Sequence, residues 1–550
     1  MSRAGAARPL RAALAALGLA AVAAAAPAQP PEPEAWLTVR SAHFTVYSDA
    51  GPERASEIAI GLERLRDAFA RLSPEMSLRS PVPTRIVAFR DAESFAPYKS
   101  VADRDGLKIL GQFLAHRDGN FIALNADPSL VGALATIQHE YVHQLVEHNF
   151  PGVPLWFNEG LAEYYSTFAA EGEVAVVGRP VRRHLGWLHS HQKFSLAAVL
   201  GATRESAAGH GAAAAGELYA VSWLLVHYLL SGDVDRLDAA AELLYLLDAG
   251  EEPEAAIQTS LGLDADELTA RLREYLTRPL ARAGWRLPVG GDADPEAAPM
   301  AAADLLSHLG DLLSRQQRLE AANRHYDLAL AYDGRHAEAH SGLALVRDLE
   351  GRLDEAAVLH REAIALEPAA AEPYLRFGRH LMSVVQGAPP VGTSAAELAE
   401  EARRMFATAA ALAPGFAECR AMLGAAQLLP GGEPARGAVL LEEVRRELPR
   451  RADVVFNLLQ LYLADDRIAP AAALLGGTLA RLADDEMLAR AREAVERTSF
   501  LKAAREALAD GDIEEGLQLL DRALEVTSDA DLRAALAARR ADIERRSRGQ

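Results

Sequence analysis

The clearest chemistry in the sequence lies in a short histidine and glutamate motif. His139, Glu140 and His143 form an H-E-x-x-H pattern. Histidines four residues apart lie on one face of a helix, so their imidazoles can bind a single Zn²⁺. The glutamate beside the first histidine can then act as a general base on an activated water. Surface histidines on an amphipathic helix produce the same pattern, so the motif by itself indicates a zinc site without establishing it.

A catalytic zinc site also needs a third protein ligand. Glu147 shares the helical face, but it lies about 12 Å along the axis from His139, too far to bind the same ion. His148 is out of register and is better explained as a solvated residue at the helix end. The extended metzincin pattern requires Gly at 146 and His at 149, where this chain has Val146 and Asn149.

The remaining candidate for the third ligand is Glu159, in the segment WFNEGLAEY at 156–164. Pro151, Gly152 and Pro154 precede it and would end the first helix and begin a second. A second helix that folds back would bring Glu159 to the metal. We therefore predict a helical hairpin that presents His139, His143 and Glu159 as metal ligands.

The H-E-x-x-H motif followed by this segment resembles the gluzincin metallopeptidases of the thermolysin and M1-aminopeptidase type. The spacing is most similar to that of the bacterial peptidase MA-like domains (the DUF1570 type), many of which are exported and fused to tetratricopeptide repeats. The resemblance implies a Zn²⁺ cofactor, with Glu140 as the general base. It also implies that Glu163 orients a ligand imidazole. An ordinary exposed acid on the helix is the alternative for Glu163.

Hydrolysis also requires a donor for the oxyanion that forms at the substrate carbonyl. Tyr219, in ELYAVSW at 217–223, resembles the Y-x-x-S-W segment of the peptidase MA-like domains, and a core tyrosine is the alternative. His189 and His191 are weaker candidates. The reaction implied is peptide-bond hydrolysis in which Glu140 carries a proton from water to the leaving nitrogen. No G-x-M-E-N loop of the M1 aminopeptidases is present, which favours an endopeptidase. A zinc amidase acting on cell-wall peptides would use the same residues.

An α+β domain over residues 36–285 would position these side chains. Apolar alternation predicts strands at Trp36–Val39, His43–Tyr47, Arg85–Phe89 and Phe121–Leu124. A helical stripe predicts a helix over 52–72. Asp127 and Pro128 would begin the motif's helix, which should run to about His148. Within the resemblance, strand 119–125 would be the sheet edge that pairs with extended substrate.

The second half of the chain shows a sequence repeat. Leu309, Gly310, Ala322 and Ala329 recur 34 residues later as Leu343, Ala344, Ala356 and Ala363, which is the tetratricopeptide spacing of small residues between paired helices. Looser copies follow, with a Gly/Pro insertion around 386–394. The expected fold is an α+β zincin-like metallopeptidase domain followed by an all-α tetratricopeptide-repeat solenoid. A linker at 286–300 would precede the array at 301–548, whose groove would hold a peptide or protein partner.

The amino terminus predicts export. Residues 1–28 carry three arginines, an Ala/Leu-rich run and a small-residue cleavage pattern, the layout of a signal peptide. We expect a bacterial protein that is periplasmic or secreted, with an uncleaved anchor as the alternative. No later stretch predicts a membrane span. The 57 Lys and Arg against 77 Asp and Glu disfavour a nucleic-acid partner. Cys419, the single cysteine, excludes an intrachain disulfide and is expected to be buried.

Two functions from different classes are compatible with these features. The first is an exported zinc metallopeptidase whose repeat array recruits a substrate or partner. The second is a non-catalytic tetratricopeptide-repeat scaffold that retains a residual zincin domain. Glu140 together with a third ligand favours the peptidase, because a retired site could lose that glutamate without losing its fold.

Overall fold

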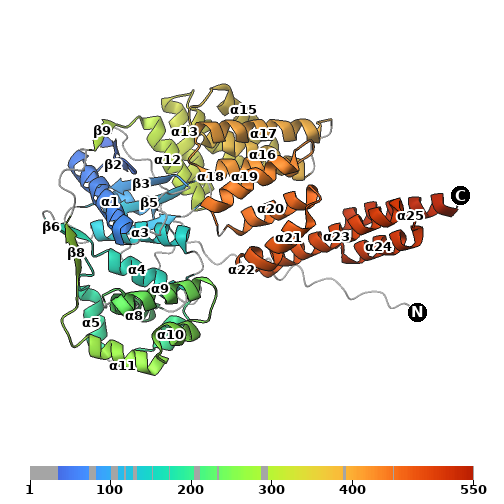
Figure 1. The fold of residues 1–550 in the computed structure, drawn as a ribbon. Helices are drawn as coiled ribbons and strands as arrows, with labels where there is room; N and C mark the ends of the chain where they lie inside the picture. The colour runs from blue at the N-terminus through green and yellow to red at the C-terminus, as the bar shows by residue number, and fades with distance from the viewer. Residues whose placement is uncertain are drawn as a thin grey trace, which may run out of the picture.

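The fold was examined in a computed structural model of the chain (Figure 1). The structure describes residues 35–548 except 73–77, 79–81, 101–109, 115, 117–118, 128–132, 151–152, 172–173, 192, 204–210, 232–233, 287–294, 388–391 and 450. The predicted signal peptide lies outside the described residues. No helix in the described part of the chain is long and apolar enough to span a membrane.

A six-stranded mixed sheet organises the first half, in the order β4-β5-β3-β2-β1-β9. Its strands are β1 (Leu37–Arg40), β2 (Thr45–Ser48), β3 (Thr84–Phe89), β4 (Gly111–Leu114), β5 (Asn120–Asn125) and β9 (Glu296–Pro299). The pairs β2–β3 and β3–β5 are parallel, and the other neighbouring pairs are antiparallel. The four predicted strands are all present, with ends shifted by at most two residues.

The expectation that strand 119–125 forms the sheet edge is wrong. The strand β5 pairs with β3 on one side and with β4 on the other, and every residue of β5 is buried. The antiparallel strand β4 lies outside β5 and forms the edge instead. The alternation signal in β4 is only four residues long, which is why sequence analysis did not detect this strand.

Two helices cover one face of the sheet. They are α1 (Pro52–Leu72), at the predicted bounds, and α3 (Ala133–Asn149). Alternate strand residues such as Ile86 and Ile122 pack against them in one core. The predicted helix-initiating pair is only partly described: Asp127 donates its backbone N–H to Asn125 Oδ1 at 2.9 Å, and Pro128 lies outside the described residues.

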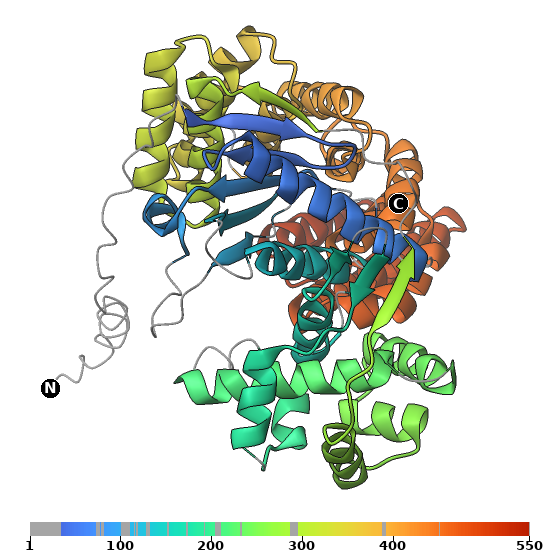
Figure 2. The same cartoon turned by 90° about the vertical axis from the view of Figure 1, so that its left-hand side faces the viewer.

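A group of helices and a small sheet lies below the main sheet (Figures 1 and 2). The helices are α4 (Leu155–Tyr165), α5 (Arg182–Ser190), α6 (Leu196–Leu200), α8 (Gly211–Leu230), α9 (Val234–Asp248), α10 (Pro253–Leu261) and α11 (Ala265–Tyr275). The small sheet has the order β6 (Ala169–Glu171), β7 (Val174–Val177), β8 (Ala283–Arg286). Helices α4 and α8 touch closely, since a Cβ on Gly160 would lie 2.4 Å from the Ser222 carbonyl oxygen.

The second half is a solenoid of paired helices that resembles a tetratricopeptide-repeat array. The pairs are α12 (Ala302–Arg315) with α13 (Leu319–Tyr332), α14 (Ala337–Leu349) with α15 (Leu353–Ala365), α16 (Glu372–Gln386) with α17 (Ala395–Leu412), α18 (Ala417–Ala425) with α19 (Pro434–Glu447), and α20 (Ala452–Ala464) with α21 (Ile468–Leu474). The repeat's small residues lie where helices touch. Gly310 and Gly342 both contact the ring of Tyr326, and Gly378 contacts Phe406.

The end of the array departs from the repeat. Helix α21 continues as a π-helical turn over Leu475–Leu479 and the short α22 (Ala480–Leu482). Three helices then extend away from the sheet in Figure 1: α23 (Asp485–Ala509), α24 (Ile513–Val526) and α25 (Ala530–Arg548). Cys419 is fully buried in α18, as expected.

The two halves share a hydrophobic core. Strand residues that point away from α1 and α3, including Phe89 and Phe121, pack with α12 and α13 of the array. Helix α2 (Ala92–Phe95) and the 3₁₀ turn Ala96–Tyr98 complete this core, and Tyr98 Oη lies 2.9 Å from Nε2 of His325. The predicted linker at 286–300 is therefore not a free connection, because its Glu296–Pro299 segment is β9 and pairs with β1.

Candidate metal centre

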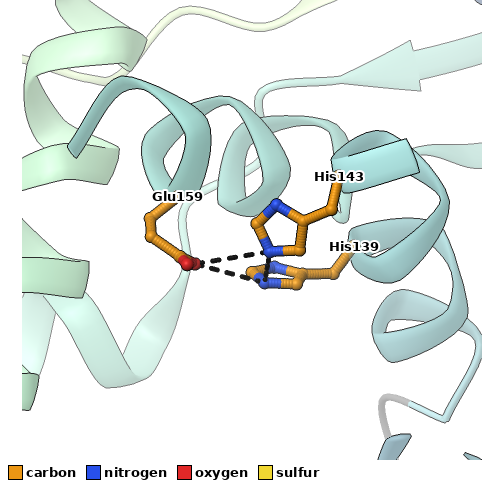
Figure 3. Close-up of side chains that lie close together, drawn as sticks. All are labelled: His139, His143 and Glu159. Atoms are coloured by element: carbon orange, nitrogen blue, oxygen red, sulfur yellow. Dashed lines mark hydrogen bonds and ion pairs between the residues drawn. The ribbon is translucent and has the colours of Figure 1, made fainter. Parts of the chain in front are cut away.

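Helices α3 and α4 form the predicted hairpin and bring His139, His143 and Glu159 together (Figure 3). The Nε2 atoms of the two histidines are 3.0 Å apart, and each lies 3.5 Å from Glu159 Oε2. The histidines project from α3 one turn apart, and the glutamate faces them from α4. The three side chains are partly buried, at 12% to 17% exposed, so one side of the cluster remains open to solvent.

The spacing of these three atoms fits a metal ion. A point equidistant from them lies about 1.9 Å from each, close to the 2.0–2.1 Å that zinc keeps to imidazole nitrogen and carboxylate oxygen. Two histidines and one glutamate are also a ligand set of catalytic zinc sites, which leave the fourth position to water or substrate. Within the described residues, His139, His143 and Glu159 would therefore hold Zn²⁺.

The neighbouring residue Asn158 fixes the orientation of one ligand. Its Oδ1 atom lies 2.9 Å from His143 Nδ1, on the side of the ring opposite Glu159. Burial lowers the pKa of His143, but hydrogen bonding to Glu159 and the charges of Glu159 and Glu140 raise it to about 9. The same negative charges that retain a proton on this imidazole would attract a metal cation.

Glu140 lies beside the cluster and is partly buried. Burial raises the pKa of its carboxyl, and the positive charges of the two histidines oppose that rise. A backbone hydrogen bond from Phe113 of β4 also reaches this carboxylate. The position places the proposed base between the metal ligands and the edge strand of the sheet.

Glu163 is not an exposed acid, since only 2% of its surface is accessible. It lies one turn after Glu159, with Oε1 3.8 Å from Nδ1 of His139 and Oε2 3.0 Å from Nε2 of His184. Burial raises its pKa, whereas His184, His139 and Arg183 lower it to about 2. The carboxylate therefore stays charged behind the first histidine, although 3.8 Å exceeds hydrogen-bond distance.

Sequence analysis did not detect His184 or Arg183 of α5. Arg183 forms a hydrogen-bonded ion pair with Glu163, and His184 is 4% exposed. No motif connects either residue with the hairpin, so only the packing of α5 identifies them. From the sequence alone, both residues could be recognised only as polar positions of an amphipathic helix.

Tyr219 of α8 lies within electrostatic range of the same carboxylates. Its pKa is raised, first by the negative charge of Glu159, then by burial and by Glu163 and Glu140. The side chain is half-buried rather than part of the core. The packing of α8 against α4 thus brings Tyr219 toward the predicted ligands.

His189 and His191 occupy a different environment. Both are exposed, and their Nδ1 atoms lie 2.6 Å and 3.0 Å from the carbonyl oxygens of Leu185 and Trp187. The His191 ring also stacks on Trp187. These contacts place the pair at the carboxyl end of α5, where histidines complement the helix dipole. The side chains of Glu147 and His148 are not among those that the structure describes.

Part of the chain matches a protein family, and its second half is similar to solved repeat proteins. Residues 133–244 match the family described as a protein of unknown function, DUF1570. This segment begins with α3 and includes the three clustered residues and Tyr219. No curated protein matches the chain.

Three of the similar solved structures are YrrB, a TPR protein with an unusual peptide-binding site, PilF of Pseudomonas aeruginosa, and TTC0263, a thermophilic TPR protein of Thermus thermophilus. YrrB is 20% identical over 35% of this chain and 92% of its own, with a TM-score of 0.29. PilF is 20% identical over 43% of this chain and 97% of its own, with a TM-score of 0.30. TTC0263 is 21% identical over 35% of this chain and 99% of its own, with a TM-score of 0.29.

Proposed function

We propose that this protein is a zinc-dependent peptidase of the gluzincin type that hydrolyses peptide bonds. The observation that carries the proposal is the convergence of two imidazole nitrogens and one carboxylate oxygen within 3.0–3.5 Å, with a partly buried glutamate beside them. The match to DUF1570 over the same segment supports the resemblance from which the peptidase assignment came.

In this function Glu140 is the general base, while His139, His143 and Glu159 hold the metal. Zinc, when bound, lowers the pKa of water and polarises the substrate carbonyl. Burial raises the pKa of Glu140 above its ordinary value, which favours a carboxylate that accepts a proton from the attacking water and donates it to the leaving nitrogen. Tyr219 would donate a hydrogen bond to the oxyanion, and its raised pKa keeps the hydroxyl protonated.

The substrate would bind along the edge strand β4. Among the described residues this strand has a partner on one side only, so an extended polypeptide can pair with its other side. Phe113 in β4 also donates a hydrogen bond to Glu140, which brings a peptide on this strand close to the base. An edge strand that accepts a chain in its middle favours an endopeptidase.

The scaffold function remains the second candidate, and the array of helix pairs is the observation that favours it. Stacked helix pairs offer surfaces to protein partners, and such a role would need no chemistry at the hairpin. In either function we propose that residues 1–28 direct the protein out of the cytoplasm.

Zinc content and peptide cleavage together test the proposal. We expect the purified chain to bind zinc and to cleave members of a mixed peptide library. Glu140→Gln should retain zinc but lose about 10²- to 10⁴-fold in cleavage rate. Glu242→Gln, an exposed position on α9, serves as the control and should cleave normally. A chain that binds no zinc contradicts the metal centre, and equal cleavage by wild type and Glu140→Gln supports the scaffold.

A further inference from the structure

A second concave site lies between the array and the sheet. It is a cavity of about 270 Å³ among helices α12, α14 and α16, and its wall also includes His116 from the connection between β4 and β5. The guanidinium groups of Arg315, Arg376 and Arg379 line it. Clustered arginines are unexpected in a chain whose net charge is −20, so their position calls for a specific cause.

The carboxylates in this cavity are already engaged. Asp311 accepts hydrogen bonds from Arg376 and from the Tyr326 hydroxyl, each at 2.7 Å. The two oxygens of Asp348 lie 2.9 Å and 2.7 Å from ring nitrogens of His360 and His380.

The compensation of Arg315 is weaker, because the charge of Asp311 acts on it without a direct ion pair. Within the described residues no carboxylate lies within ion-pair distance of it, and its guanidinium lies 5.3 Å from the centroid of the Phe121 ring. Its Nε is buried without an acceptor, and so is Nε of Arg376, a residue only 5% exposed. A buried cation with unused donors is costly unless an anion completes the site.

The pKa of Arg315 also indicates that a further negative group would stabilise its charge. Burial lowers its pKa, Asp311 opposes this, and the positive charges of Arg376 and Arg85 add to the lowering, which leaves the pKa at about 10. Its charge is therefore disfavoured by its surroundings in the absence of a further negative group. A carboxylate fits the planar fork of a guanidinium and would supply that group.

The cavity also has an apolar side. Leu349 and Leu353 line it and are 46% and 41% exposed, and Leu345 lies next to them. An inorganic anion would leave these leucines in water. A carboxylate carried by a polypeptide would cover them with its own methylene and side-chain groups.

The edge strand connects this cavity with the metal centre. Phe113 contacts Glu140, and His116, three residues further along the chain, lines the cavity. A chain of three residues spans at most about 10 Å, so His116 lies within that reach of Phe113. A polypeptide that pairs with β4 beside Glu140 would therefore reach the cavity with a residue about three positions from the cleaved bond.

We infer that this cavity binds a carboxylate of the polypeptide substrate and so selects peptides with an acidic group about three residues from the cleaved bond. The inference rests on the proposed peptidase function, because the carboxylate is placed relative to Glu140. It assigns Arg315 as the principal contact and Arg376 as a second donor.

Binding to the full-length Glu140→Gln protein tests the inference without catalysis. The probes are fluorescent, capped decapeptide pools with one fixed central Glu or Gln, and a third pool with Gln and a free terminal carboxylate. We expect about tenfold tighter binding of the Glu pool than of the Gln pool. Arg315→Gln should reduce this ratio toward one, while Arg404→Gln, an exposed change on α17, should leave it intact.

A second variant and a stability measurement separate loss of carboxylate recognition from loss of folding. Arg315→Lys retains the positive charge and should preserve part of the ratio between the affinities for the Glu and Gln pools. The melting temperature of each variant shows whether a lost preference reflects lost recognition or lost folding. Equal affinity for the Glu and Gln pools overturns the inference, and so does preference for the free-terminus pool alone or competition only by inorganic phosphate. Retained Glu preference in a protein whose wild type cleaves nothing supports the binding site and contradicts the peptidase function.

Discussion

Asn158 Oδ1 lies 2.9 Å from Nδ1 of His143, and the next residue in the chain, Glu159, faces Nε2 of the same ring. One turn of α4 thus contacts both nitrogens of one imidazole. Because the amide oxygen accepts the Nδ1 proton, the neutral form of the ring carries its lone pair on Nε2, the nitrogen that faces Glu159 and His139. The asparagine in the N-E pair therefore selects the tautomer that can bind a metal.

Replacing Asn158 should weaken metal binding. Asn158→Ala removes the acceptor for Nδ1–H, so we expect a 10- to 100-fold loss of zinc affinity, about the cost of losing such an outer contact. Competition with a chromophoric chelator measures this affinity. Asn323→Ala, on α13 of the repeat array, should bind zinc as the wild type does. Unchanged affinity in Asn158→Ala would show that the ring is held by its packing alone.

Tyr219 should act on turnover rather than on substrate binding. Removing one oxyanion donor costs about 10²- to 10³-fold in kcat, so Tyr219→Phe should show this loss with KM nearly unchanged. Tyr245→Phe, at a position 73% exposed, is the matched control. If Tyr219 only fills space, the phenylalanine variant will keep its kcat, and any effect will appear in the melting temperature.

A carboxylate on α1 should make stability depend on pH. Burial raises the pKa of Glu63, but hydrogen bonds from Ser41 and His43, at 2.6–2.7 Å, hold the pKa below its ordinary 4.5. A lowered pKa gives stability that is present above pH 4.5 and is lost as the pH falls below it. Glu63→Gln should therefore cost about 1–2 kcal/mol at pH 7 and much less near pH 3.

Urea unfolding at the two pH values measures this difference. Glu57→Gln, whose side chain is 57% exposed, should change the free energy of unfolding by only a few tenths of a kcal/mol, roughly the value of a surface pair. A Glu63→Gln penalty that is equal at pH 7 and pH 3 would contradict the charged hydrogen bonds.

The helix contacts of the array should tolerate no added methyl group. A Cβ on Gly342 would lie 2.2 Å from the Tyr326 ring, which is itself fully buried, so Gly342→Ala should cost about 1–3 kcal/mol through overpacking. Gly186, also helical, has open space around its Cβ position, and Gly186→Ala should instead stabilise by about 0.5–1 kcal/mol. Thermal unfolding of both variants checks the opposite signs.

Most of the metal centre could be read from spacing along the chain. The i, i+4 positions of His139 and His143 fix their common face, and Pro154 precedes the helix α4 that returns Glu159 to them. Their geometry is local, because His139 and Glu159 are only 20 positions apart. Glu163 could be placed only as one turn beyond Glu159, since its burial depends on α5.

The elements that depend on distant partners were not predictable in the same way. Strand β4 is four residues long and shows its role only through its pairing with β5. The segment Glu296–Pro299 has the composition of a linker and becomes a strand because β1 offers it an unpaired edge. Short strands gain their stability from their neighbours, so their own residues carry little signal.

Contacts between residues a few turns apart encode the helical hairpin of His139, His143 and Glu159, the buried stripe of α1 and the period of the helix pairs, so these features could be predicted from the sequence. Tertiary structure alone decided that the array packs against the sheet and that Arg85 of β3 pairs with Glu372 of α16, 287 positions away. It also placed Nε of Arg315 where it is buried and has no acceptor among the described residues. Charge compensation between distant segments depends on which surfaces pack together, and the periodicity of the local sequence does not indicate which surfaces these are.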